Sequence, residues 1–196
     1  MERETPSRQR DGRTDEVLCV AVSRGDEGAL RVLLDRYRDR TYGILARSLP
    51  NRADADDLFQ ELWIRVVRAA DDFDPTLRFS SWVYRIAVNL VRDHLRRRAA
   101  ARVVDSEDGS PPERADEAPA PDAVAAGNQE ARALARAIAR LPEGQREVLV
   151  LRYFEGLGEG EVAEAAGIPP GTVKSRLHHA VRGLRRELAT LREEEG

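Results

Sequence analysis

The sequence predicts an all-α protein with two small helical domains joined by a flexible acidic linker, the C-terminal one containing a helix-turn-helix. Three observations support this fold class. The chain is rich in Ala, Leu, Arg and Glu and poor in β-branched runs, which favours helices over strands. Apolar residues recur at helical spacing on both sides of residues 101–127. That central segment holds many prolines and acids, so it cannot bury enough apolar surface to fold and is predicted to be the linker.

The N-terminal domain is expected over residues 15–100, after a polar tail at 1–14 that is predicted to be disordered. Pro75 disfavours helix at Asp74, so a loop is expected before the last helix of this domain. The apolar spacing predicts four helices, at about 15–23, 27–48, 54–70 and 80–98.

The helix expected at 54–70 has two interpretations. Leu58, Leu62 and Val66 form a core stripe, and the acids at its start are favoured by the helix dipole, as in any stable helix. Yet its apolar surface is larger than that stripe needs. A protein-binding face is therefore the functional hypothesis, made of Asp57, Gln60, Glu61 and Ile64.

The helix expected at 80–98 separates into two sides at about 100° per residue. The predicted core side carries Val83, Ile86, Ala87, Leu90, Val91 and His94. The opposite side carries Arg85, Asn89, Arg92 and Arg96, which would be left free. Charged rows are usually solvated faces, but those normally mix acids with bases, and this row has no acid. The pattern favours phosphates along a nucleic-acid strand with a base edge beside Asn89.

The C-terminal domain is expected over residues 128–196, with helices at 128–140 and 143–154 separated by Pro142. A short helix, a tight turn at Gly167 and a long helix starting at Pro170 then form a helix-turn-helix pattern. Residues near the start of that last helix would reach base edges in the major groove, and later arginines would contact phosphates. The candidates are Thr172, Lys174, Ser175, Arg176, His178, His179 and Arg182.

Charge distribution agrees with these two surfaces, although the formal net charge of the whole chain is only −3. Residues 85–98 hold five arginines against one aspartate, and 172–186 hold five basic residues and no acid. Residues 103–122 hold seven acids against one arginine. The small net charge therefore results from two basic helices and an acidic linker that offset each other.

Several classes of protein are disfavoured. Cys19 is the single cysteine, so neither an internal disulfide nor a cysteine zinc site is expected, and adjacent His178 and His179 diverge too far to share a metal. Apolar runs are too short to span a membrane, and the N-terminus lacks the apolar core of a signal peptide. We therefore predict a cytoplasmic protein without cofactor, metal or enzymatic activity.

Two long stretches together resemble the extracytoplasmic-function sigma factors of bacterial RNA polymerase. The first is "DADDLFQELWIRVVRAADDFDPTLRFSSWVYRIAVNLVRDHLRRR" and the second is "LPEGQREVLVLRYFEGLGEGEVAEAAGIPPGTVKSRLHHAVRGLRREL". Two departures from the family are visible. Histidines stand at 178 and 179 where members commonly have an aromatic residue and Arg, and Gly158 stands where many have Ser, a better helix cap.

The resemblance implies sigma region 2 at 15–100 and sigma region 4 at 128–196. It implies binding to core RNA polymerase, at the β′ clamp helices through Asp57, Gln60 and Glu61, and at the β flap. The loop at 72–79 and the helix after it would open the minus-ten element and capture a flipped base, with contacts from Phe73, Trp82, Arg85, Asn89, Arg92 and Arg96. The last helix would recognise the minus-thirty-five element of promoter DNA. An anti-sigma factor is a further expected partner, and no direct membrane insertion is expected.

Two other functions remain as alternatives. A stand-alone helix-turn-helix transcriptional regulator would explain the C-terminal domain but not the arginine row at 85–96. A nuclease would use Asp54, Asp56, Asp57 and Glu61 as metal ligands, although no His or Lys lies nearby in the sequence.

Overall fold

The computed structural model describes residues 11–105 and 129–194, and these are helical with short connections and contain no strand. The predicted all-α fold is confirmed for this part of the chain. The N-terminal domain consists of α1 (Asp15–Ser23), α2 (Glu27–Ser48), α3 (Arg52–Arg68), the 3-10 turn η1 (Ala70–Asp72) and α4 (Phe79–Asp105). The C-terminal domain consists of α5 (Gln129–Ala139), α6 (Glu143–Leu149), the π-helical turn η4 (Val150–Phe154), α7 (Glu159–Ala166) and α8 (Pro170–Glu194).

Side-chain caps start the first three helices. Thr14, Asp26 and Asn51 each accept a hydrogen bond from a backbone N–H three residues later, at 3.4, 2.9 and 2.8 Å. Such caps satisfy N–H groups that a helix start leaves without partners. Asn51 explains why α3 begins two residues earlier than expected.

Both ends of the N-terminal domain extend further than the sequence indicated. Arg36 donates to the backbone carbonyls of Asp11 and Arg13, so residues 11–14 pack on α2, and the rest of the predicted tail lies outside the described residues. α4 continues to Asp105, five residues into the predicted linker, of which 106–127 lie outside the described residues.

The helix-turn-helix forms as predicted. α7 ends at Gly167, whose φ of +65° is left-handed, and Ile168 then donates to the carbonyl of Ala163 at 3.1 Å. This bond closes the helix end and turns the chain sharply. Val173 and Leu177 of α8 are buried against the turn, so the outer side of α8 stays exposed.

Replacing Gly167 with alanine should destabilise the protein by about 1 kcal/mol, because an L-residue is disfavoured at this φ. A Cβ at this position would meet no atom within 4 Å, so the cost comes from the backbone alone. Gly160→Ala in α7 is the matched control, and it should stabilise by about 0.5–1 kcal/mol. Urea unfolding of both variants measures the difference, and equal midpoints would contradict a left-handed turn in solution.

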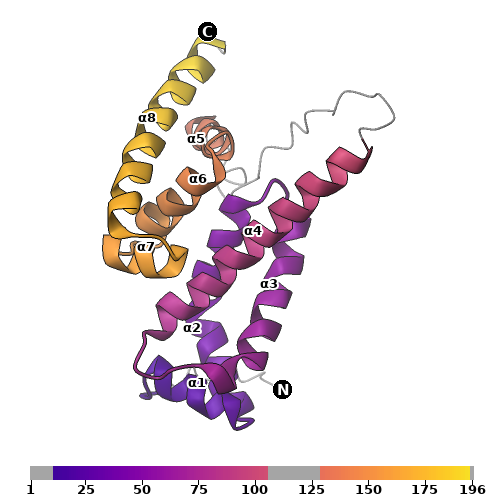
Figure 1. Ribbon diagram of the computed structural model, residues 1–196, viewed down its shortest axis with the longest axis vertical. Helices are drawn as coiled ribbons and strands as arrows, with labels where there is room; N and C mark the ends of the chain where they lie inside the picture. Colours follow the sequence, from indigo (N-terminus) through magenta and orange to yellow (C-terminus); the bar gives the residue numbers. More distant parts are fainter. Residues whose placement is uncertain (1–10, 106–128, 195–196) are drawn as a thin grey trace, which may run out of the picture.

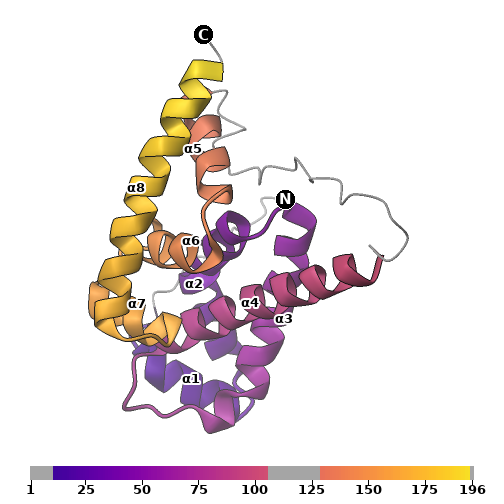
Figure 2. The same cartoon turned by 45° about the horizontal axis from the view of Figure 1, so that its top comes forward.

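The two domains pack against each other. α7 lies beside the N-terminal half of α4 in both views (Figures 1 and 2), and α8 extends away from the N-terminal domain. Buried apolar side chains form one cluster across this boundary, with Phe79 and Tyr84 on one side and Leu151 and Val162 on the other. The sequence did not predict this shared interior. Within the described ranges, no helix is long and apolar enough to cross a membrane.

Candidate nucleic-acid and protein interfaces

The inner side of α4 holds the helix in its domain. Most of the predicted core positions are buried, and Tyr84 and Val88, which the prediction omitted, are buried as well. Ile86 and His94 are only half-buried. The His94 ring lies 3.1 Å from a carboxylate oxygen of Asp54, the first acid of α3. Packing therefore presents the arginine side of α4 outward from its own domain, as the periodicity indicated.

The α4 arginine row, defined as Arg85, Asn89, Arg92 and Arg96, is only partly free. Arg85 donates through Nε and Nη2 to the backbone carbonyl of Glu164, at 2.9 and 2.5 Å. Asn89 and Arg96 are exposed, and Arg96 pairs weakly with the neighbouring Asp93 at 3.4 Å. The expectation that the whole row would stand free is therefore wrong for Arg85, and it is also wrong for Arg92.

Arg92 makes the strongest polar contact between the domains. Its guanidinium donates to both carboxylate oxygens of Glu147 in α6, at 2.9 and 2.7 Å, and to the carbonyl of Ala166 at 2.7 Å. A two-point Arg–carboxylate contact of this kind is both strong and directional. Burial raises the pKa of Glu147 even though Arg92 lies against it. Desolvation is thus a substantial cost of this contact.

Two further contacts extend the boundary along α4. Arg78, just before the helix, pairs with Glu161 at 2.5 Å, and the Ser81 hydroxyl donates to the Glu164 carboxylate at 2.9 Å. Glu161 also accepts from the backbone N–H of Gly158 at 2.9 Å, which keeps the carboxylate half of the expected capping pair. The exposed side of α4 therefore faces acids and helix-end carbonyls of the C-terminal domain.

Aromatic rings fill the start of α4 and the loop before it. Phe73 is only 6% exposed, and its ring centroid lies 6.0 Å from that of Phe79 and 5.1 Å from that of Trp82. Trp82 is half-buried. Of the two aromatic residues expected to contact DNA, Trp82 is the more accessible, and the buried Phe73 packs against it.

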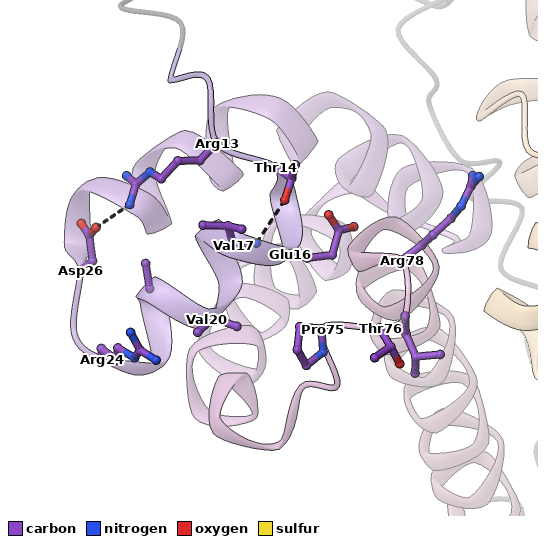
Figure 3. A pocket seen from close by; sticks show the side chains of 12 residues that line it. Arg13, Thr14, Glu16, Val17, Val20, Arg24, Asp26, Pro75, Thr76 and Arg78 are labelled. Carbon is purple, nitrogen blue, oxygen red and sulfur yellow. Dashed lines mark hydrogen bonds and ion pairs between the residues drawn. The ribbon is translucent and has the colours of Figure 1, made fainter.

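A cleft of about 770 Å³, which the sequence analysis did not predict, lies between α1 and the loop before α4. Figure 3 shows Arg13 paired with Asp26 at one end and Arg78 at the other. Val17 and Leu77, both in its lining, are more than half exposed. The sequence offered no clear signal for this cleft, because α1 is an almost continuous apolar run after its first two acids and the position of the loop depends on tertiary packing.

The outer face of α3 is open. Asp57, Gln60 and Ile64 are exposed, whereas Glu61 is half-buried and pairs with Arg65 at 2.8 Å. Val67, 43% exposed and three residues after Ile64, extends the same face and was missed by the sequence analysis. Its helical spacing from Ile64 could have identified it.

Three of the four acids that a nuclease would need, Asp54, Asp56 and Glu61, have side-chain partners. Asp54 contacts His94 and pairs with Arg98 at 2.9 Å, and Asp56 accepts from the Tyr42 hydroxyl at 2.7 Å. Among the residues that the structure describes, no group of three or more His, Cys, Asp or Glu could hold a metal ion. Asp54 and Asp56 therefore help to hold α3 against α4 and α2.

The candidate DNA-binding residues of α8 share its outer side. Lys174, Ser175, His178, His179 and Arg182 are exposed, and Thr172 and Arg176 are half-buried. The Arg176 guanidinium lies close to Gly144 of α6, where a Cβ would approach it to 2.9 Å. Gly144 therefore leaves room for Arg176 to lie along α6. The centroids of the two histidine rings are 5.7 Å apart, and the rings are inclined at 67° to each other.

Comparisons with known families match both domains. The family model of Sigma-70 region 2 matches residues 33–101, and that of Sigma-70, region 4 matches residues 131–184. The ECF RNA polymerase sigma factor SigW of Bacillus subtilis (strain 168) is 34% identical over 185 residues, covering 87% of this chain and 94% of the relative. The ECF RNA polymerase sigma-E factor of Escherichia coli (strain K12) is 32% identical over 173 residues, covering 85% and 90%.

Solved structures share the fold. CnrH, in complex with the cytosolic domain of CnrY, matches with a TM-score of 0.66 and 26% identity, over 93% of this chain and 99% of that one. The sigma factor RpoE from Bartonella quintana, in complex with the anti-sigma factor NepR, matches with a TM-score of 0.65 and 24% identity, over 80% and 94%.

Proposed function

The chain belongs to the extracytoplasmic-function sigma factors of RNA polymerase, and from this premise we propose which of its surfaces bind polymerase and which bind promoter DNA. As a sigma factor, it directs RNA polymerase to promoters and initiates transcription there. The observation that carries the proposal is the separation of an acidic and apolar face on α3 from basic faces on α4 and α8.

The outer face of α3 binds the clamp helices of the polymerase β′ subunit. Asp57, Gln60, Glu61 and Ile64 make this contact, and Val67 extends it. Exposed apolar side chains beside acids, on a helix whose other side is buried, support this assignment. The C-terminal domain contacts the β flap.

The α4 arginine row binds the minus-ten element. Its guanidinium groups hold phosphates, Asn89 contacts the edge of a flipped base, and Trp82 stacks nearby. Phe73 is buried in this conformation, so its contribution comes through the position of Trp82. The outer side of α8 binds the minus-thirty-five element through Thr172, Lys174, Ser175, Arg176, His178, His179 and Arg182.

A protein partner that restrains the sigma factor is also expected. CnrH, 26% identical, is held in a complex with the cytosolic domain of CnrY. An anti-sigma factor is the partner that we propose for this chain.

Run-off transcription with core polymerase on a library of genomic fragments tests the function directly. The protein should support transcripts from a limited set of promoters and should bind those promoters tightly only together with polymerase. A stand-alone regulator would instead bind duplex DNA by itself and support no transcript, and that result would overturn the proposal.

Arg176→Ala should weaken binding of the polymerase complex to promoters recovered in this way by about 10-fold, since a guanidinium–base contact contributes ~1–3 kcal/mol. Affinity for core polymerase should change little, because the clamp-binding face proposed on α3 is on the other domain. Arg185→Ala, which removes the same charge later on α8, is the control and should weaken binding less and without regard to promoter sequence. Loss of polymerase binding by Arg176→Ala would contradict this division of roles.

A further inference from the structure

A second cleft, of about 380 Å³, lies between α8 and the turn that joins α5 to α6. Both α5 and α6 lie on one side of α8 (Figures 1 and 2). Gly183 of α8 is buried against the turn, where a Cβ would approach a methyl carbon of Leu141 to 2.9 Å. Glycine at this position therefore lets the two walls of the cleft come close together.

Positive charge dominates this cleft. Its lining includes Arg140 from the turn and His179, Arg182, Arg186 and Glu187 from α8. Among the described residues of the lining, Glu187 is the only acid, and its carboxylate lies 3.3 Å from the guanidinium of Arg140. Arg182 and Arg186 are exposed and have no ion-pair partner in the part of the chain that the structure describes. Because like charges repel each other, an anion is favoured between them.

The cleft opens at the edge of the surface proposed for the minus-thirty-five element. His179 and Arg182 belong to both, since they lie on the outer side of α8 and also line the cleft. Arg186 follows Arg182 by four residues and so continues the same side by one turn. In a helix-turn-helix complex the start of the recognition helix enters the major groove, and groups further along meet the DNA backbone. A backbone phosphate of the promoter is therefore the anion that this cleft would meet.

His179 differs from the arginines of the cleft because its charge depends on pH. Histidine ordinarily gains its charge between pH 8 and pH 5, whereas arginine stays protonated throughout this range. The charged and titratable groups around it are Arg140 of the turn, Arg182, Arg186 and Glu187 of α8, and the adjacent His178. A proton on His179 adds one positive charge and a second N–H donor to the cleft.

We propose that this cleft binds a backbone phosphate of promoter DNA beside the minus-thirty-five element, and that it binds this phosphate more tightly when His179 is protonated. The inference rests on the proposed role of α8 in DNA binding. Arg140 exchanges Glu187 for the phosphate, so the turn between α5 and α6 contacts the DNA from the side opposite to α8. Promoter binding therefore strengthens as the pH falls from 8 to 6.

Promoter binding by the complete polymerase complex at pH 6 and pH 8 tests the role of His179. Fluorescence anisotropy of a labelled promoter duplex, recovered by run-off transcription, measures the affinity. The wild type should bind up to about 10-fold more tightly at pH 6, the effect of one charge-assisted hydrogen bond. His179→Gln should bind weakly at both pH values, and His179→Arg tightly at both. An equal pH dependence in the wild type and His179→Gln would overturn the proposal.

His178→Gln is the matched control, because it removes an adjacent, exposed imidazole that points about 100° away around the helix. It should change the affinity by a similar factor at both pH values and so keep the wild-type ratio. Titrating groups of the polymerase contribute equally to every variant. Loss of the ratio in both histidine variants would assign the pH dependence to the pair of rings and not to the cleft, which contradicts the proposal.

Promoter duplexes in which one phosphate at a time is replaced by a neutral methylphosphonate distinguish a phosphate contact from a base contact. One replacement beside the minus-thirty-five element should remove the pH dependence of the wild type and leave His179→Gln unaffected. The slope of log affinity against log salt concentration should also steepen by up to about 0.9 between pH 8 and pH 6, because one more phosphate is neutralised. A pH dependence that survives every replacement would mean that His179 contacts a base, and the proposal would be wrong.

Two variants test the charges that face each other across the cleft. Arg140→Ala should weaken promoter binding by about 3- to 10-fold, through loss of one phosphate contact. Glu187→Gln should strengthen it, because the amide releases Arg140 and removes the negative charge from the cleft. Unchanged affinity in both variants would exclude a phosphate between the two walls.

Arg176→Ala separates failure of this inference from failure of the proposed function. If that variant weakens promoter binding as expected but the variants of Arg140, His179 and Glu187 do not change it, α8 recognises the minus-thirty-five element and only the phosphate cleft is ruled out. If none of these variants changes promoter binding, the proposed role of α8 in DNA binding fails together with the inference that depends on it.

Discussion

Replacing Asn89 with alanine is expected to slow promoter opening by about 10- to 100-fold, the effect of losing ~1–3 kcal/mol of base contact. Asn89 is exposed on α4 between Arg85 and Arg92, which hold oxygen atoms on either side of it. Its amide can both donate to and accept from a base edge, whereas the flanking arginines can only donate. Fluorescence of 2-aminopurine in the minus-ten element, followed after mixing with the polymerase complex, measures the opening rate.

Affinity for core polymerase should not change in Asn89→Ala, because α3 and α4 present their exposed sides in different places. Gln60→Ala is the matched control, since it also truncates an exposed amide on a helix. It should weaken polymerase binding and leave the opening rate of the saturated complex unchanged. Equal loss of binding and opening in Asn89→Ala would count against base capture.

The packing of the two domains against each other is expected to weaken by on the order of 3 kcal/mol as the pH rises from 5 to 8, through Glu155. This residue follows η4, and its side chain is 4% exposed because it packs against α2. A Cβ at Gly43 of α2 would lie 3.2 Å from the carboxylate, so Gly43 leaves room for it. Burial raises the pKa of Glu155 to about 7, although Arg47 and Arg40 act to lower it. Tyr84 of α4 also faces this carboxylate.

The direction follows from proton uptake. Separation of the domains exposes Glu155 and returns its pKa toward the ordinary 4.5. At pH values between 4.5 and about 7, Glu155 therefore takes up a proton when the domains pack together. The stabilisation is therefore complete below pH 4.5 and is lost as the pH rises through about 7. Burial raises the pKa of Glu147 at the same boundary, which adds to the effect in the same direction.

Urea midpoints measured from pH 5 to pH 8 test this dependence. Glu155→Gln should remove most of the slope and should be more stable than the wild type at pH 8, because an uncharged amide replaces a buried carboxylate. Glu143→Gln, which removes an exposed carboxylate at the start of α6, is the control and should keep the wild-type slope. A slope unchanged in Glu155→Gln would assign the pH dependence to other groups.

Local structure followed closely from local sequence. α1 and α2 have the boundaries that apolar spacing predicted, and α3 differs because Asn51 caps it two residues earlier. The turn at Gly167 was also predictable, since few residues other than glycine adopt its φ. These features depend on residues within a few positions of each other.

Candidate site residues were predictable as surfaces but less well as individual contacts. The spacing of Arg85, Asn89, Arg92 and Arg96 placed them on one side of α4, and the structure agrees. Phe73 could not be judged in this way, because its burial depends on Phe79 and Trp82 arriving from the next helix. Val67, which lies on the same exposed face three residues after Ile64, was omitted although its spacing indicated it.

The sequence by itself determined the helices, the helix-turn-helix, the two basic surfaces and the sigma-factor family. Only the tertiary structure decided that the C-terminal domain lies on the α4 arginine row. The physical reason is that a guanidinium donates equally well to a carboxylate, a helix-end carbonyl or a phosphate. A pattern of arginines therefore predicts that oxygen atoms will be bound. Which oxygen atoms occupy it depends on Glu147, Glu164 and Ala166, which lie more than 50 residues away in the chain and reach α4 only through folding.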